Sequence, residues 1–187
     1  MSLILHRKDF WIITALWCSC AVASMGIFNI VPLFLVKERG IQIETANTIF
    51  SISRIGGLIA MISIGFMIDR FNLKKLLFVL LLATALTTVG IAVIENYWAL
   101  SVMLFLQATF SVVFFPAGLV AIAKLTTLSE RSMFTGILMS MSGIIGPGLS
   151  PIILGAIADV WNFQVGILGS GIIMILACLL IKSLKEV

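Results

Sequence analysis

Ionisable side chains are scarce in this chain, and their scarcity excludes several kinds of function. Only 11% of the 187 residues are charged, and the one histidine, His6, precedes the first apolar stretch. A Ser-His nucleophile or a histidine-based metal site within the apolar stretches is therefore excluded. The sequence also lacks a G-x-x-x-x-G-K-[ST] loop for binding phosphate groups. We expect a protein that is not an enzyme and that uses no cofactor and no metal.

Cysteine is rare as well. The three cysteines, Cys18, Cys20 and Cys178, all fall within apolar stretches and form no C-x-x-C pair. A free cysteine in such surroundings behaves as a small apolar residue. We interpret all three as packing residues.

Apolar residues, in contrast, dominate the chain. They make up 61% of it, with a mean hydropathy of +1.22, which is more apolar surface than a soluble domain of this length buries. Charged residues cluster at intervals of roughly 17 to 25 residues, the length of helix that crosses a hydrocarbon core about 30 Å thick. The sequence predicts an all-α membrane protein, a single bundle over residues 1–187, and not a barrel of alternating strands. The six predicted spans are about residues 10–36, 46–68, 73–94, 97–123, 133–158 and 161–181.

Lysine and arginine are divided unequally between the two ends of these spans. Nine lie at the end that carries both termini, and two lie at the opposite end. Such a bias marks the cytoplasmic side, so we expect an integral multi-pass protein of the plasma (bacterial inner) membrane with both termini cytoplasmic. The basic charge then follows from topology, and we expect no nucleic-acid partner. The nine are Arg7, Lys8, Arg70, Lys74, Lys75, Lys124, Arg131, Lys182 and Lys185, and the two are Lys37 and Arg39.

One ionisable residue falls in the middle of a predicted span. Arg54 precedes Asp69 by fifteen residues, which is roughly 22 Å along a helix. A charge at that depth costs at least about 2.5 to 3.5 kcal/mol, so it should face a cavity or a partner. Its planar fork of donors suits a carboxylate, a phosphate or another oxyanion, and we expect it to bind an anionic solute. The alternative is a structural ion pair, or a bond to the backbone of a broken helix.

Two amides could complete such a site. Asn29 in the first span and Gln107 in the fourth lie in apolar surroundings, and each is followed by a proline. We expect both to bind the solute through hydrogen bonds, with bonding between helices as the open alternative. The third and sixth spans have no charge in mid-span and are expected to face lipid.

The fifth span is dense in small residues. We expect Gly143, Gly146, Pro147 and Gly148 to serve helix packing, because small residues let helix backbones approach closely in a membrane. A direct contact with a solute is the alternative. The prolines of this segment should bend the helix.

A short charged hairpin joins the second and third spans. It reads Gly65-Phe-Met-Ile-Asp69-Arg70-Phe-Asn72-Leu-Lys74-Lys75. The pattern resembles the signature loop of the major facilitator superfamily, with Asn72 where that loop usually has glycine, a substitution that the tolerance of asparagine for left-handed backbone angles allows. The glycine-proline element of the fifth span resembles that family too, although Ser150-Pro151 replaces the glycine pair that exporters carry there.

The resemblance implies a fold and a function. Members of that family usually have twelve spans, so this chain resembles one half, preferably the C-terminal half, with the N-terminal half as the alternative. Each half is built from two inverted three-helix repeats, and the two halves move around one site. The expected function is half of a secondary active transporter, a permease that moves a small anionic solute by alternating access. A non-transporting membrane scaffold that retains the fold is the alternative.

Two further expectations follow from the resemblance, and a third follows from the positions of the acidic residues. Gly65, Asp69, Arg70, Lys74 and Lys75 would form a cytoplasmic gate loop, which in that family stabilises the state closed to the cytoplasm. The partners would be the solute, the lipid bilayer, and a complementary six-helix half or a second copy of this chain. Because no carboxylate lies in mid-span, a coupling proton would need a group in another segment, with exchange or facilitated movement as the alternative.

Overall fold

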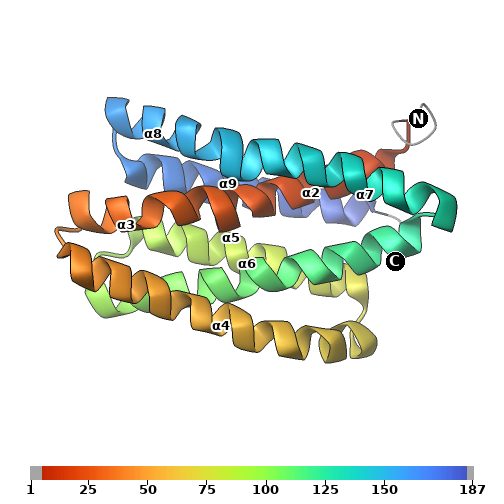
Figure 1. Cartoon of the computed structure of the whole chain (residues 1–187), viewed down its shortest axis with the longest axis horizontal. Coiled ribbons are helices and arrows are strands. Elements are labelled where there is room, and N and C mark those ends of the chain that lie inside the picture. The colour runs from red at the N-terminus through yellow and green to blue at the C-terminus, as the bar shows by residue number, and fades with distance from the viewer. Residues whose placement is uncertain (1–5, 185–187) are drawn as a thin grey trace.

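The computed structural model describes residues 6–184 and shows a bundle of long helices that run roughly along one axis (Figure 1). All regular structure in these residues is helical. The helices are α2 (Lys8–Ala21), η1 (Val22–Gly26), α3 (Ile27–Lys37), α4 (Ile43–Arg70), α5 (Leu73–Val93), α6 (Tyr97–Leu125), α7 (Leu128–Gly143), η2 (Ile144–Leu149), α8 (Ser150–Val160), α9 (Phe163–Leu180) and η3 (Ile181–Ser183).

Continuous stacks of these elements give six helices long and apolar enough to cross a membrane. Each overlaps one predicted span. The first consists of α2, η1 and α3, the fifth of α7, η2 and α8, and the sixth of α9 and η3. We refer to them below as helices one to six.

Short polar segments between the spans stop and start these helices. Asn72, Asn96 and Asn162 each accept a backbone N–H of the next helix through the side-chain oxygen, and Thr127 with Glu130 forms a capping box before α7. Such caps satisfy donors that a helix start leaves free. At the turn after α3, Gly40 has a φ of +64°, a conformation that suits glycine.

Helices one and five are each interrupted by a π-helical segment, η1 and η2, and the two segments pack against each other. A Cβ atom on Gly146 would lie 2.8 Å from Cβ of Ala21, and a Cβ on Gly26 would lie within 3.4 Å of the Gly146 carbonyl. The two backbones can approach this closely only because glycines stand at the crossing. Pro147 lies in η2 and removes one backbone donor there, whereas η1 contains no proline.

Burial is distributed unevenly among the six helices. Only 28% of the apolar stretch is buried in α4 and in helix five, compared with 56% in α5 and 44% in helix six. α5 packs along both α6 and α9 and exposes a narrow stripe at Val79, Leu86 and Val93. The expected lipid exposure of helices three and six is therefore only partial, and helices two and five are the most open.

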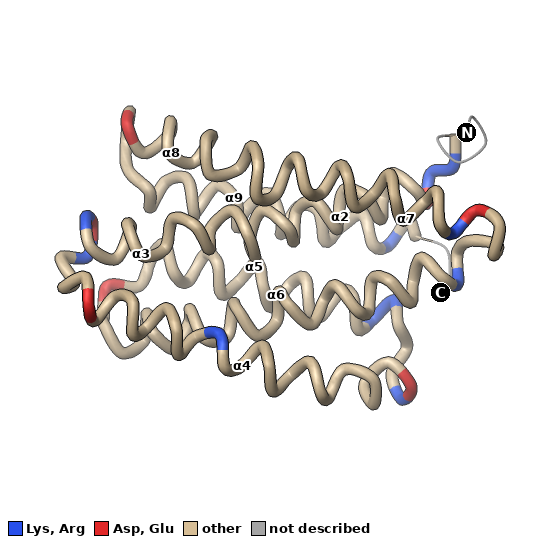
Figure 2. Tube along the Cα trace, in the orientation of Figure 1, with Lys and Arg blue, Asp and Glu red and all other residues tan. Residues whose placement is uncertain are grey.

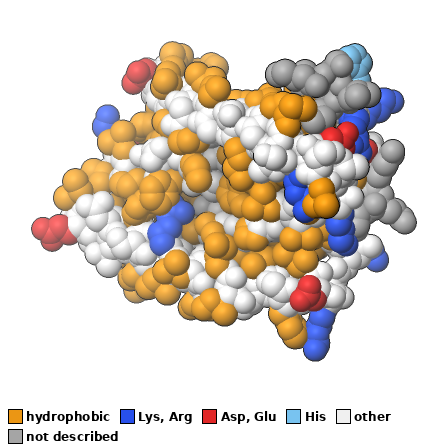
Figure 3. All heavy atoms as spheres, turned by 45° about the vertical axis from the view of Figure 1, so that its right-hand side comes forward, with side chains coloured by type: hydrophobic (Ala, Val, Ile, Leu, Met, Phe, Trp, Pro, Cys, Tyr) orange, Lys and Arg blue, Asp and Glu red, His pale blue; other side chains and the backbone are white. Residues whose placement is uncertain are grey.

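The charged residues gather at the two ends of the bundle, apart from one position along α4 (Figure 2). Hydrophobic side chains cover much of the face between the ends (Figure 3). At the end opposite the described termini, the carboxylate of Glu38 accepts the N–H groups of Phe163 and Gln164, the latter at 3.0 Å. The neighbouring Arg39 donates to the Ala92 carbonyl at 2.8 Å. One turn thus joins helix one to the N-terminus of α9 and the C-terminal end of α5, with charges that favour both helix dipoles.

Candidate functional site

Arg54 lies near the middle of α4 and contacts two neighbouring aromatic rings. Its guanidinium carbon is 3.8 Å from the ring centroid of Phe28, which belongs to helix one, and 4.9 Å from that of Phe50, one turn earlier on α4. The two rings are themselves 4.5 Å apart. Cation–π contacts of this kind contribute about 0.5 to 2 kcal/mol each, so two of them offset much of the cost of placing the charge in mid-span.

The stacking leaves the N–H edge of the guanidinium unused. In the part of the chain that the structure describes, Arg54 forms no hydrogen bond and no ion pair, and its buried Nε has no acceptor. A guanidinium presents five donors in one plane, and aromatic rings contact its faces and not that edge. The donors therefore remain available for an acceptor that the described residues do not provide.

A cavity of about 480 Å³ lies beside these donors. Four helices contribute to it: helix one, α4, α6 and helix five. Ser24 and Asn29 supply polar atoms, and the Ser24 hydroxyl is also buried without a hydrogen-bond partner among residues 6–184. Buried polar groups in native structures rarely lack a partner. The lining residues are Ser24, Met25, Phe28, Asn29, Arg54, Val112, Phe115 and Pro147.

The structure brings together two of the three residues expected to bind a solute. Arg54 and Asn29 line the same cavity, but Gln107 does not. The side chain of Gln107 is buried, and its Nε2 donates to the Ala23 carbonyl at 2.8 Å. This is the bond between helices that the sequence left open as an alternative. Through this bond, Gln107 supplies a donor to the carbonyl of Ala23, the η1 residue directly before Ser24.

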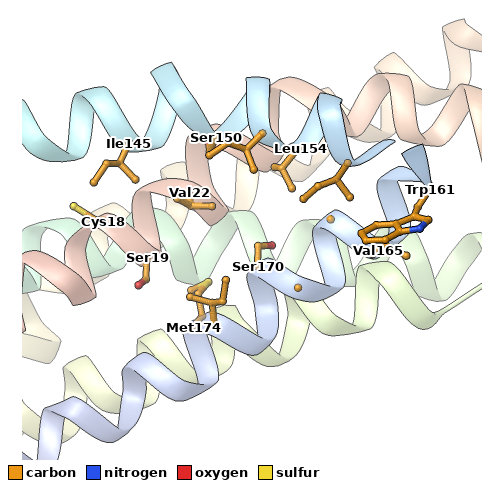
Figure 4. Close-up of a pocket in the computed structure, with 15 residues that line it drawn as sticks. Cys18, Ser19, Val22, Ile145, Ser150, Leu154, Trp161, Val165, Ser170 and Met174 are labelled. Atoms are coloured by element: carbon orange, nitrogen blue, oxygen red, sulfur yellow. The ribbon is translucent and has the colours of Figure 1, made fainter. Parts of the chain in front are cut away.

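A second cavity, of about 450 Å³, lies between helices one, five and six (Figure 4). Its lining includes Cys18, Val22, Leu154 and Met174, with Trp161 at one end. Its polar side-chain groups include serine hydroxyls and the indole N–H of Trp161, and no charged residue lines it among the described residues. It therefore offers an apolar surface and no group that would fix an anion.

The small residues of helix five divide into two groups. Gly146 lies against Ala21, whereas a Cβ on Gly143 would meet nothing within 4 Å and one on Gly148 would meet only the Gly143 carbonyl, at 3.4 Å. Pro147 lines the Arg54 cavity. Ser150 bonds to the Gly146 carbonyl and packs against Gly26, so the glycine of helix one makes room for the serine.

In the hairpin between α4 and α5, Asn72 is not in the left-handed region. Its φ is −60°, and its Oδ1 accepts the Lys75 N–H at 3.2 Å as the cap of α5. The tolerance of asparagine for a left-handed backbone was the explanation expected from the sequence, and this explanation was wrong. Asn72 has an extended backbone, and asparagine suits this position because its side chain caps α5. Lys74 donates to the carbonyls of Lys182, at 3.2 Å, and Leu184 at the end of helix six.

The other hairpin residues make few contacts in this chain. The Arg70 guanidinium lies 4.1 Å from the ring centroid of Phe66. Asp69 is exposed and has no hydrogen-bond or ion-pair partner in the described part of the chain, and a Cβ on Gly65 would meet nothing within 4 Å.

The aromatic rings around Arg54, the Ser24 hydroxyl and the η1 segment were not anticipated. Phe28 and Asn29 are adjacent in sequence, so the amide pointed to the correct turn of helix one. Nothing in the sequence, however, indicates which of the many phenylalanines faces α4.

Comparison with known proteins gives one result. The family model described as the Major Facilitator Superfamily matches residues 2–186 of the chain. No curated protein matches it.

Proposed function

The chain belongs to the major facilitator superfamily of transporters, and from this premise we propose that it is one six-helix half of a secondary active transporter. In this proposal it moves a small anionic solute by alternating access around the Arg54 cavity. Membership in a transporter family favours transport over the alternative of a non-transporting scaffold. The plasma membrane, cytoplasmic termini, the C-terminal half and the two inverted repeats belong to the same proposal.

The observation that carries the anionic solute is the unpaired edge of Arg54. A positive group with free donors, held by Phe28 and Phe50 beside a cavity, matches the geometry of a carboxylate or phosphate. Asn29 and Ser24 would add neutral hydrogen bonds to the same ligand. Gln107 would act indirectly in this proposal, by holding the η1 backbone that carries Ser24.

Open glycines on the two most exposed helices support a second six-helix unit. A Cβ on Gly65 in α4, or on Gly136 or Gly143 in α7, would meet nothing within 4 Å. Glycines on an exposed helix face allow another helix to approach closely. We propose that a complementary half, or a second copy of this chain, covers this face and the open side of the cavity.

The gate loop would act across that same boundary. Gly65, Asp69 and Arg70 lack partners from other helices within the described residues, whereas Lys74 is already bound to the end of helix six. We therefore assign contact with the opposite half to Gly65, Asp69 and Arg70. Lys74 would hold the loop at the end of the bundle, and the backbone N–H of Lys75 would do so through its bond to Asn72.

Anion binding by the purified chain tests the site. Inorganic phosphate, sulfate and small carboxylates are titrated by isothermal calorimetry against wild type, Arg54→Ala and Arg54→Lys, with Lys37→Ala as a control that removes one exposed positive charge elsewhere. Loss of a charged hydrogen-bond partner costs about 1.5 to 3 kcal/mol, so Arg54→Ala should weaken binding roughly 10- to 100-fold. The affinity of Arg54→Lys should lie between those of wild type and Arg54→Ala, because lysine keeps the charge and loses the planar set of donors. Absence of anion binding in wild type, or equal binding in Arg54→Ala, would refute the anionic site.

Cross-linking in membranes tests the second unit. A cysteine at Gly65 or Gly136 should form an intermolecular disulfide if a second copy is the partner, whereas a cysteine at Leu179 on the exposed side of α9 should not. The native cysteines are buried and provide a low background. A monomer without cross-links at either glycine position would contradict pairing by a second copy and leave the complementary half as the proposed partner.

A further inference from the structure

A basic cavity lies at the end of the bundle that carries both described chain ends, between the start of α5 and the end of helix six. Its volume is about 530 Å³, and its lining combines Lys74, Lys75 and Lys182 with Phe78 and Val79. No acidic side chain lines it within residues 6–184. Figure 2 shows lysine and arginine positions concentrated at this end.

The three lysines differ in what they already bind. Lys74 is half-buried, and its Nζ donates to two carbonyls at the end of helix six, which fixes the two helix ends beside each other. Lys75 and Lys182 are exposed, and their Nζ atoms have no acceptor among the described residues. Asn72 also lines the cavity as the cap of α5, so the positive end of that helix dipole adds to the charge of the lysines.

An exposed apolar stripe continues from this cavity along α5. Val79, Leu86 and Val93 are 58%, 55% and 59% exposed, and their spacing of seven residues places them on one helix face. The stripe extends over fourteen residues, or about 21 Å. A positive group at the membrane surface is thus followed by an apolar track that enters the hydrocarbon region.

From this arrangement we propose that the cavity binds one anionic phospholipid. The phosphate contacts Lys75 and Lys182, and an acyl chain lies against Phe78 and the Val79 stripe. Basic pockets between membrane helices bind anionic headgroups for the same electrostatic reason. The apolar track favours a lipid over a free phosphate compound, which would use the lysines alone. The proposal needs only membrane insertion, so it stands apart from the Arg54 site and from transport.

Native mass spectrometry of the purified chain, released from mixed micelles, tests this site. Phosphatidylglycerol, phosphatidylcholine with the same acyl chains, and glycerol phosphate without acyl chains are titrated separately. The variants are Lys75→Ala/Lys182→Ala and, as a charge-matched control, Lys37→Ala/Lys124→Ala, which removes two exposed lysines that do not line the cavity. Val79→Ser tests the apolar track.

Phosphatidylglycerol should bind the wild type more tightly than phosphatidylcholine. A juxtamembrane lysine raises the affinity for an anionic lipid about 5-fold. The affinity for phosphatidylglycerol should therefore fall roughly 25-fold in the double variant and less than about 2-fold in the control. Val79→Ser should weaken lipid binding without affecting glycerol phosphate. The proposal is overturned if the two lipids bind equally, if the control loses as much as the double variant, or if glycerol phosphate binds as well as the lipid.

Discussion

Two glycines of helix five, three residues apart, should respond in opposite directions to the same substitution. A Cβ on Gly146 would lie 2.8 Å from Cβ of Ala21, 3.1 Å from its carbonyl oxygen and 3.2 Å from its carbonyl carbon. Carbon atoms in contact prefer about 3.5 to 4.0 Å, so the two helices would have to separate by about 0.7 Å. Gly143→Ala, in contrast, meets no atom within 4 Å.

Two contributions determine the unfolding free energies of Gly143→Ala and Gly146→Ala. Replacing glycine by alanine in a helix stabilises it by about 0.5 to 1 kcal/mol, and this term is shared by both variants. Inserting a methyl group into a closely packed contact costs about 1 to 3 kcal/mol, and this term applies only to Gly146. Gly143→Ala should therefore be neutral to stabilising, and Gly146→Ala should be about 1 to 3 kcal/mol less stable than Gly143→Ala.

Equilibrium unfolding in mixed micelles measures this difference in stability, with tryptophan fluorescence, including that of the buried Trp17, as the signal. Ala21→Gly in the Gly146→Ala background removes the nearest atom and leaves the backbone atoms in place, so it should recover part of the loss, with a coupling of at least about 0.5 kcal/mol. The explanation of the crossing is refuted if Gly146→Ala is as stable as Gly143→Ala. Absence of coupling would show that the added methyl group at position 146 is accommodated by a movement that does not involve the side chain of Ala21.

Two further predictions concern the turn that follows α3. Glu38→Gln should speed hydrogen exchange at the amides of Phe163 and Gln164 and destabilise the chain by about 1.5 to 3 kcal/mol, because both N–H groups lose a charged acceptor. Unchanged exchange at Phe163, or an equal effect of Glu44→Gln, would contradict this role. Gly40→Ala should cost about 1 to 2 kcal/mol in unfolding free energy because φ is +64°, and a stability equal to that of wild type would argue against the left-handed turn.

The sequence predicts the helices well because their determinants are local. Apolar runs of sufficient length, closed by asparagine caps and charged turns, indicate the six spans without reference to any partner. The pairing of helices is different. Gly146 opposite Ala21 depends on the register between two helices far apart in sequence, and a list of small residues cannot separate Gly146 from Gly143.

The sequence predicted the charged residue of the candidate site but not the side chains that surround it. Depth alone singled out Arg54. Its stacking on Phe28 requires helix one to pass beside α4. The hydrogen bond from Gln107 to the Ala23 carbonyl requires the η1 segment, and the run of apolar and small residues there gives no local signal for a π-helix. The role of Asn72 was misjudged because asparagine suits both caps and left-handed turns, and only the φ of −60° distinguishes them.

The turn at Glu38 and Arg39 has a mechanical consequence for helix one. The half of helix one that ends at this turn, α3, is bonded through it to α9 and α5, so we expect these three segments to move together. The other half, α2, is not bonded to this turn, and the π-helical segment η1 separates the two halves. We expect bending of helix one to concentrate at Val22–Gly26, which would turn Ser24 and Met25 relative to Arg54 and change the shape of the cavity while both ends of the bundle keep their packing.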